Sequence, residues 1–260
     1  MEPKPAHLGT KYGAQFKDAS IVNAYHHRPP YPVAVLSTLV ELITDQPRVV
    51  LDVGCGTGDL ARRLAADVEQ VDAVDFSQAM IAKGKMLPGG DSPRLNWIYG
   101  RLEEVEFQPP YALITAGESL HWMEWEEVMP LFRRILTPDG YLAIVGRSAL
   151  PVPWRDELLA IIQRFSTNRE YRPYNLIEEL ERRHLFQKQG EAFAIPVEFT
   201  QSLEDYIESF HSRNGLSRDR MTIEAAKAFD TEARNSVEPF LKDGQVVQSN
   251  LGHVEWGKPQ

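Results

Sequence analysis

Residues 49–60 of this 260-residue chain read VVLDVGCGTGDL, and the fold is decided in this stretch. Its first part is a run of apolar, mostly β-branched residues, which is typical of a strand buried on both faces of a parallel sheet. Gly54, Gly56 and Gly58 then alternate with other residues before a helical pattern resumes at Asp59. Glycines let a backbone approach a ligand closely, and the start of a helix offers unpaired N–H groups. The stretch therefore predicts a nucleotide-binding turn between a strand and a helix.

The chain after this turn alternates strands with helices. Apolar runs predict further strands at 71–75, 95–100, 111–116 and 141–145. Ser77 is a plausible N-cap for the helix after the second strand, and a helix is expected over 125–136, which contains Pro130. This alternation predicts an α/β fold with a doubly wound, seven-stranded and mostly parallel sheet, a Rossmann-like arrangement.

The flanking regions divide the chain into three parts of one domain. Residues 1–45 are expected to form an N-terminal helical arm that covers the ligand, and residues 46–149 the ligand-binding core. Residues 150–260 are expected to form a helical lid over the sheet, followed by terminal antiparallel strands. In this last part the pattern predicts helices at 154–164, 176–185, 203–210 and 223–240, and strands at 192–199 and 246–256.

Composition narrows the class of protein. Apolar residues make up 43% of the chain, enough for a substantial core, and the net charge is −9. A nucleic-acid groove needs clustered lysines and arginines, so this charge argues against nucleic-acid partners. The single cysteine excludes an intramolecular disulfide, and we find neither a leader pattern nor an apolar run of about 20 residues. We expect a cytoplasmic protein without membrane partners, monomeric or homodimeric.

A carboxylate strengthens the interpretation of the glycine turn. The glycines are spaced one residue more tightly than in the dinucleotide fingerprint G-x-G-x-x-G. Asp75 lies at the end of the second predicted strand, 23 positions after Asp52. A carboxylate at that strand end can accept hydrogen bonds from two ribose hydroxyls. The alternative, a tight turn beside an ordinary strand-end aspartate, carries less weight.

Three motifs in this order resemble those of the class I S-adenosylmethionine-dependent methyltransferases. The resemblance is greatest to the branch with ubiquinone/menaquinone-biosynthesis and trans-aconitate methyltransferases. VLDVGCGTG at 50–58 matches the first motif of the family, and VDFSQAM at 74–80 the second. LTPDGYL at 136–142 is similar to the turn before the fifth strand, with Asp139 in place of a glycine. The resemblance implies S-adenosylmethionine as methyl donor, S-adenosylhomocysteine as product, and O-, C- or N-methylation of a small molecule.

The resemblance also implies a set of cofactor-binding residues. They are Tyr25, Arg28, Asp52, Gly54, Gly56, Gly58, Asp75, Phe76, Met80, Arg101, Leu102, Glu103 and Ala116. Arg28 is expected to pair with the methionine carboxylate. Arg101 departs from the family, in which an aspartate often binds the adenine amino group. Because arginine accepts no hydrogen bond, the adenine must be bound by the backbone of Arg101 and Leu102, or by Glu103.

His121 is the candidate catalytic residue. It follows the fourth predicted strand, so it could act as general base for a hydroxyl, amine or acidic carbon. A histidine that packs on Trp122 is an equally weighted alternative, since a carboxylate or thiolate acceptor needs no base. The candidate substrate contacts are Trp122, Glu118, Phe16 and Trp154. For Glu118, a charge at the start of a helix is the favoured alternative. We expect no metal site, because Ala116 and Gly117 stand where one carboxylate ligand would be needed.

Two alternative functions stay open at this point. The first is a tRNA-modifying methyltransferase, against which the acidic charge weighs. The second is a catalytically inactive, cofactor-binding regulatory protein. The arginines between 164 and 183 are expected on a solvated surface, paired with nearby glutamates, although an anionic substrate pocket is the alternative.

Overall fold

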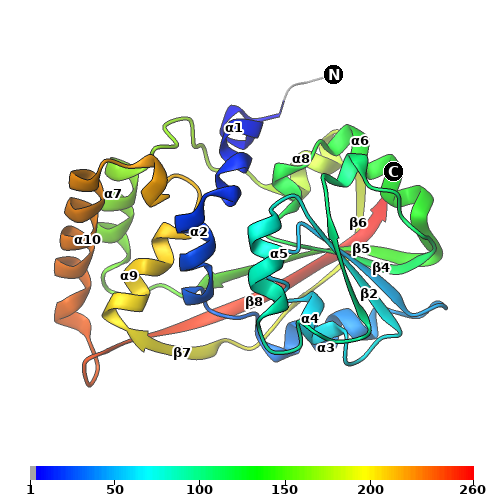
Figure 1. The fold of residues 1–260 in the computed structure, drawn as a ribbon, viewed down its shortest axis with the longest axis horizontal. Helices are drawn as coiled ribbons and strands as arrows, with labels where there is room; N and C mark the ends of the chain where they lie inside the picture. Colours follow the sequence, from blue (N-terminus) through cyan, green and yellow to red (C-terminus); the bar gives the residue numbers. More distant parts are fainter. Residues whose placement is uncertain (1–3) are drawn as a thin grey trace. The chain divides into compact units, whose positions relative to one another are not determined.

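The computed structural model describes residues 4–260 and contains one mixed sheet (Figure 1). The strands are β1 Val49–Val53, β2 Gln70–Asp75, β3 Leu95–Tyr99, β4 Tyr111–Gly117, β5 Leu136–Ala149, β6 Phe186–Phe193, β7 Val197–Ser202 and β8 Gln245–Pro259. Their order is β3-β2-β1-β4-β5-β8-β6, and β7 also pairs with β8. The pairs among β1 to β5 are parallel, whereas β8 is antiparallel to β6 and β7. The predicted α/β class and doubly wound core are confirmed.

The helices fill the connections between these strands. The α-helices are α1 Thr10–Gly13, α2 Ala19–Ala24, α3 Val33–Glu41, α4 Ala61–Leu64, α5 Gln78–Lys85, α6 Trp125–Ile135, α7 Arg155–Phe165, α8 Leu176–Arg182, α9 Leu203–His211 and α10 Ile223–Val237. The 3-10 helices are η1 Ala6–Leu8, η2 Ala14–Lys17, η3 Tyr25–His27, η4 Leu102–Glu104, η5 Leu120–Trp122, η6 Arg218–Arg220 and η7 Glu238–Phe240. Within residues 4–260, no helix is both long and apolar enough to cross a membrane.

The chain is divided into two compact units. Unit 1 comprises residues 4–30, 148–172 and 196–251 of the described chain, and unit 2 comprises 31–147, 173–195 and 252–260. Strands β1 to β4 and β6 belong to unit 2, and β7 belongs to unit 1. Strands β5 and β8 each contribute residues to both units.

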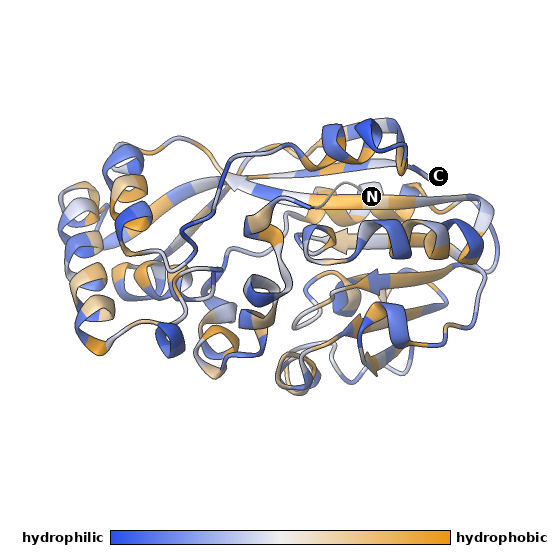
Figure 2. Cartoon of the chain, turned by 90° about the horizontal axis from the view of Figure 1, so that it is seen from above, coloured by the Kyte–Doolittle hydropathy of each residue, from blue (hydrophilic) through white to orange (hydrophobic). Residues whose placement is uncertain are grey.

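Strands β1 and β4 form the centre of the sheet in unit 2. All residues of β4 before Gly117 are buried, as are the last four of β1. Figure 2 shows hydrophobic residues along the central strands and two-sided patterns on the helices. Because both faces of a parallel sheet are covered, such strands need apolar side chains throughout. The register sets Asp52 of β1 beside Thr115 of β4, and Asp75 of β2 beside Tyr99 of β3.

Local sequence explains how several of these helices begin and pack. The side chain of Ser77 accepts a hydrogen bond from the backbone N–H of Met80, which confirms the predicted N-cap of α5. Helix α6 buries Trp125, Val128, Met129, Phe132 and Ile135 along one side. Pro130 lies inside this helix on its exposed side.

Unit 1 has an apolar core of its own. Helix α10 packs against α7 and α9, and the three lie together in Figure 1. Trp154, Tyr206, Phe210 and Phe229 are buried in this core. The indole N–H of Trp154 donates a hydrogen bond to the Tyr206 hydroxyl at 3.0 Å.

The sheet differs from the prediction in two places. It has eight strands rather than seven, because the segment expected as one strand over 192–199 contains the end of β6 and the start of β7. Pro196, which has no N–H for a strand ladder, lies between them. The expected turn at 137–140 falls within the bounds of β5, where the register against β4 jumps from Tyr111–Leu136 to Leu113–Tyr141. The turn is therefore an irregularity inside a longer strand.

Candidate active site

The glycine turn of unit 2 has a left-handed backbone at all three glycines. The φ angles are 63° at Gly54, 57° at Gly56 and 75° at Gly58, which side chains other than glycine rarely adopt. Space is also short: an added Cβ would lie 2.6 Å from Cβ of Ser119 at Gly54, and 2.5 Å from the Trp97 ring at Gly58. The turn therefore requires glycine for conformation and for close packing.

Asp75 is fixed against this turn. Its Oδ2 accepts a hydrogen bond from the backbone N–H of Gly56 at 2.8 Å, and its Oδ1 accepts one from Ser77 N–H at 2.7 Å. The residue is 6% exposed. The geometry fits the ribose-binding role expected of Asp75, which stays a prediction.

Asp52 is a second buried carboxyl behind the turn. The Thr115 hydroxyl donates to its Oδ1 at 2.8 Å. Burial raises the pKa of Asp52 to about 7, and the nearby charges of Asp75 and Asp59 act in the same direction. Asp75 and Asp59 therefore lie close enough to Asp52 to affect its pKa.

The segment after β3 lies beside Asp75. The backbone N–H of Gly100 donates to the Asp75 carbonyl at 3.1 Å. Leu102 is 6% exposed, whereas the Arg101 guanidinium is exposed and lies 3.6 Å from carboxylate oxygens of both Glu103 and Glu104. Because these glutamates engage the Arg101 side chain, the backbone of residues 101 and 102 is the simplest candidate for binding an adenine here. Phe76 is half-buried, and Met80, at 1% exposed, is a core residue.

The end of β4 carries the candidate catalytic residue. Ala116 is fully buried, and Glu118 has a left-handed φ of 51°. His121 and Trp122 follow in η5, both half-buried, with ring centroids 4.7 Å apart. His121 therefore packs on Trp122, and a role as general base is compatible with that packing.

A polar cluster at the carboxyl ends of three strands escaped the sequence-based prediction. Arg147 of β5 lies 3.2 Å from the Glu118 carboxylate and 3.6 Å from that of Asp59, and its guanidinium stacks 4.5 Å from the centroid of the Tyr31 ring. The Tyr31 N–H donates to Asp59. Glu118 is thus an ion-pair partner rather than a charge at the start of a helix. The sequence did contain a signal for this cluster, because its charged residues lie near or after the carboxyl ends of three parallel strands.

Four of the predicted site residues belong to unit 1. Arg28 donates to the Ser212 hydroxyl at 2.8 Å and to the Ser212 carbonyl, and stacks on Tyr25. Phe16 lies half-buried in η2. Trp154 is 4% exposed in the core of unit 1, and the substrate contact expected of it stays a prediction.

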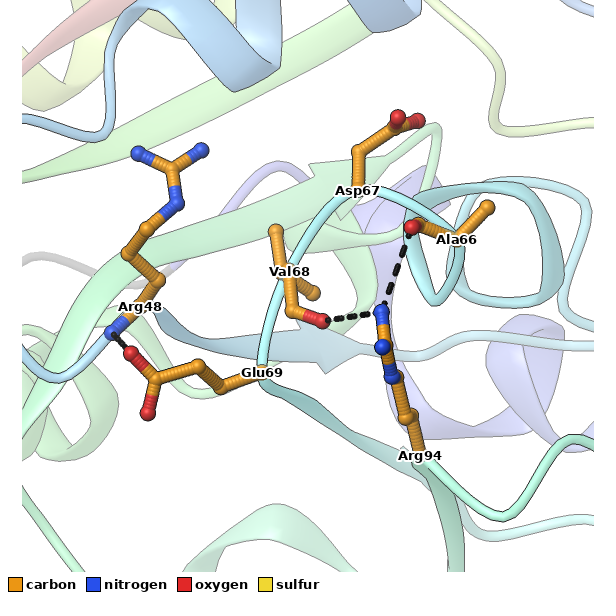
Figure 3. A pocket seen from close by; sticks show the side chains of 6 residues that line it. All are labelled: Arg48, Ala66, Asp67, Val68, Glu69 and Arg94. Atoms are coloured by element: carbon orange, nitrogen blue, oxygen red, sulfur yellow. Dashed lines mark hydrogen bonds between the residues drawn. The ribbon is translucent and has the colours of Figure 1, made fainter.

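A hollow of about 420 Å³ lies at the opposite edge of the sheet in unit 2 (Figure 3). Arg48, Glu69 and Arg94 line it and directly precede β1, β2 and β3. The two arginines bind backbone carbonyls there. Since open α/β sheets bind ligands outside the carboxyl ends of their strands, we do not assign this hollow to catalysis.

Several of the arginines between 164 and 183 have acidic partners. Arg164 pairs with Glu232, and Arg183 pairs with both Glu126 and Glu179. These pairs favour a structural interpretation of both arginines: Arg164 lies on the surface as expected, whereas the Arg183 side chain is 6% exposed and stacks on Trp125. Among residues 4–260, no group of three or more histidine, cysteine or acidic side chains is arranged to hold a metal ion.

Comparisons with known proteins agree with this geometry. Residues 50–140 match the family model of a methyltransferase domain. A malonyl-[acyl-carrier protein] O-methyltransferase of Anoxybacillus flavithermus is 34% identical over 87 residues, which are 33% of this chain and 33% of that protein. The structure of a protein of Anaeromyxobacter dehalogenans described as a type II methyltransferase has a TM-score of 0.61 at 21% identity, covering 90% of this chain and 99% of the other.

A third comparison concerns the cofactor. A methyltransferase of Thiobacillus denitrificans, solved with S-adenosyl-L-homocysteine, has a TM-score of 0.52 at 14% identity, over 90% of this chain and 96% of the other. The chain spans 54%, 33% and 38% of the length of the first three curated relatives that it matches. Residues 50–140 thus match a methyltransferase domain, and the fold of the chain is one that solved methyltransferases share.

Proposed function

We propose that this protein transfers the methyl group of S-adenosylmethionine to a small-molecule acceptor. The observation that carries the proposal is the Asp75 carboxylate, which the backbone N–H groups of Gly56 and Ser77 hold at the end of β2 against the glycine turn. Asp59 adds negative charge near the same turn. A bound S-adenosylmethionine supplies an already activated methyl group on its sulfonium, so the protein mainly has to orient the acceptor and exclude water.

The roles of the surrounding residues follow from their places in unit 2. We propose that the glycine turn and Asp75 hold the cofactor, and that the backbone at Arg101 and Leu102 binds the adenine. Where the acceptor atom carries a proton, His121 removes it as the bond to the methyl carbon forms. For a carboxylate acceptor no base is required, and His121 then serves by packing on Trp122.

Net charge supports a small acceptor over an RNA. The chain carries 28 basic and 37 acidic residues. A protein that neutralises many phosphates would need a basic stripe. The name of the Anoxybacillus relative contains a malonyl group, which is one chemical type of acceptor to test.

A methylation assay tests the proposal. The protein is incubated with S-adenosylmethionine labelled in its methyl group and with panels of small carboxylic acids, phenols and amines, and with tRNA in a separate arm. We expect transfer to a small molecule and at least a tenfold loss of rate in Asp75→Ala. Transfer to tRNA alone, or to none of these acceptors, would contradict the proposal.

His121→Gln separates the two roles of this residue. As a general base, His121 gives kcat a pH dependence that the variant loses, with the KM of the cofactor unchanged. As a packing residue, it leaves the shape of the pH profile intact when it is replaced. Circular dichroism of the variant controls for its folding.

A further inference from the structure

The short helix η5, which contains His121, is packed against the glycine turn of unit 2. Ser119 directly precedes η5 and Met123 directly follows it. An added Cβ at Gly54 would lie 2.6 Å from Cβ of Ser119 and 3.2 Å from Cε of Met123. The side chains before and after η5 therefore both lie in the space that glycine leaves open at position 54.

A hydrogen bond fixes the same contact. The Ser119 hydroxyl donates to the carbonyl of Val53 at 2.6 Å, and Ser119 is 7% exposed. Val53 is the last residue of β1 and directly precedes Gly54. The paired residues of β1 and β4 end at Asp52 and Thr115. Ser119 therefore connects the chain after β4 to β1 beyond their ladder, at the point where the glycine turn begins.

Two further hydrogen bonds hold η5 together. The Trp122 N–H donates to the Ser119 carbonyl at 3.0 Å, which closes the turn of η5 around His121. The indole N–H of Trp125, a fully buried side chain, donates to the Leu120 carbonyl at 2.9 Å. Because the backbone of η5 is tied in this way, a displacement of Ser119 also displaces His121.

We propose that Ser119 is a positioning residue that sets the place of His121 relative to the glycine turn. A ligand bound in the turn then affects His121 through the Val53 carbonyl and through the packing on Gly54. Such placement matters for catalysis, because a misplacement of about 1 Å can cost about a hundredfold in rate. The inference rests on the proposed function, since it takes the turn as the place where the cofactor binds.

Nuclear magnetic resonance of the full chain tests this coupling without a known acceptor. The probe is S-adenosylhomocysteine, and the imidazole signals of His121 are assigned by their absence in His121→Gln. In the wild type, we expect the ligand to shift these signals. Isothermal titration should give Ser119→Ala the affinity of the wild type for the ligand, because Asp75 and the glycines are intact. Most of the shift at His121 should nevertheless be lost in this variant, because η5 no longer follows the turn.

Ser236→Ala is the matched control. The Ser236 hydroxyl, in α10 of unit 1, donates to the Ala233 carbonyl at 2.9 Å, and Ser236 is 2% exposed. Both variants lose one buried hydrogen bond from a serine to a backbone carbonyl, so we expect similar drops in melting temperature. Ser236→Ala should keep the full shift at His121. If Ser119→Ala fails to fold, Ser119→Cys takes its place with the same expected loss, because a thiol fills the space and donates only weakly.

Each other result overturns the inference. An undiminished shift in the folded Ser119 variant means that the ligand acts on His121 directly, and no shift in the wild type means that the two are not coupled. An equal loss in Ser236→Ala makes the effect one of general stability. A loss of affinity in the Ser119 variant means that the hydroxyl serves the turn rather than His121.

The same titration keeps this inference apart from the proposed function. A wild type that gives no heat of binding with S-adenosylhomocysteine refutes cofactor binding itself. A wild type that binds the ligand, beside a Ser119 variant that behaves identically, refutes only the role of Ser119. Once the methylation assay supplies an acceptor, Ser119→Ala should lower kcat and leave the KM of the cofactor unchanged, and an unchanged kcat would contradict the positioning role.

Discussion

At the scale of single residues, the buried carboxyl of Asp52 links cofactor chemistry to stability. Its pKa is raised from 3.8 to about 7 by burial. A raised pKa means that the folded state binds the proton of Asp52 more tightly than the unfolded state does. The protonated carboxyl therefore contributes fully to the free energy of unfolding below pH 3.8, and this contribution is lost as the pH rises through about 7.

We therefore expect Asp52→Asn to flatten the pH dependence of folding. Between pH 5 and 8 the wild type should lose about 2.5 kcal/mol of free energy of unfolding that the variant keeps, which is the part of the shift that falls in this window. Urea unfolding at a series of pH values measures the difference. Asp67→Asn, at an exposed position, should follow the wild type. Parallel curves for the wild type and Asp52→Asn would refute the raised pKa of Asp52.

The Glu118–Arg147 pair offers a second test at this scale. The guanidinium is 12% exposed and the Glu118 side chain 30% exposed, so the pair is less screened than one on the surface. A double-mutant cycle with Glu118→Gln and Arg147→Met should give a coupling energy of about 1 kcal/mol. A coupling indistinguishable from zero would mean that Arg147 is held by Asp59 and Tyr31 instead.

At the scale of elements, replacing a glycine in the turn between β1 and α4 costs stability for two reasons that can be measured separately. One is the left-handed backbone conformation, and the other is the lack of room for a Cβ. Gly58 and Gly244 share a φ of 75°, but an added Cβ lies 2.5 Å from Trp97 at Gly58 and meets nothing within 4 Å at Gly244. The left-handed conformation costs about 1–2 kcal/mol with a side chain.

Gly244→Ala should therefore lose about 1–2 kcal/mol of stability, and Gly58→Ala clearly more. Chemical denaturation of both variants measures the difference, which is the cost of the contact with Trp97. Gly58→Ala should also weaken cofactor binding, whereas Gly244→Ala should not. Equal losses of stability would show that the turn has room for a Cβ.

These elements also show where sequence-based prediction succeeds. The glycine turn, the Ser77 cap and the apolar strands β1 and β4 depend on neighbours in the sequence, so local patterns revealed them. The break between β6 and β7 depends on a pairing with β8 that lies about fifty residues away. The irregularity in β5 likewise depends on its register with β4.

The candidate site follows the same rule. Asp52 and Asp75 were predicted because motifs mark them, and residues 101–103 were predicted from their place after the third strand although Arg101 departs from the family. Arg147 was missed because its partners, Asp59 and Glu118, come from two other loops. Trp154 was predicted as a substrate contact, and its burial in the core of unit 1 depends on long-range packing that no local pattern revealed.

At the scale of the whole molecule, the chain combines a methyltransferase core in unit 2 with a unit 1 that has its own apolar core. Unit 2 contains all the glycine-turn and carboxylate residues of the proposed cofactor site. The family model matches only residues 50–140, so it says nothing of unit 1.

Isothermal titration of the full chain with S-adenosylmethionine and S-adenosylhomocysteine tests the central claim most directly. The account predicts saturable binding of both ligands, an affinity at least tenfold weaker in Asp75→Ala and Asp75→Asn, and no change in Asp91→Ala, a control at an exposed position. Circular dichroism confirms that each variant is folded. No heat of binding with either ligand, or an unchanged affinity in folded Asp75 variants, would contradict it.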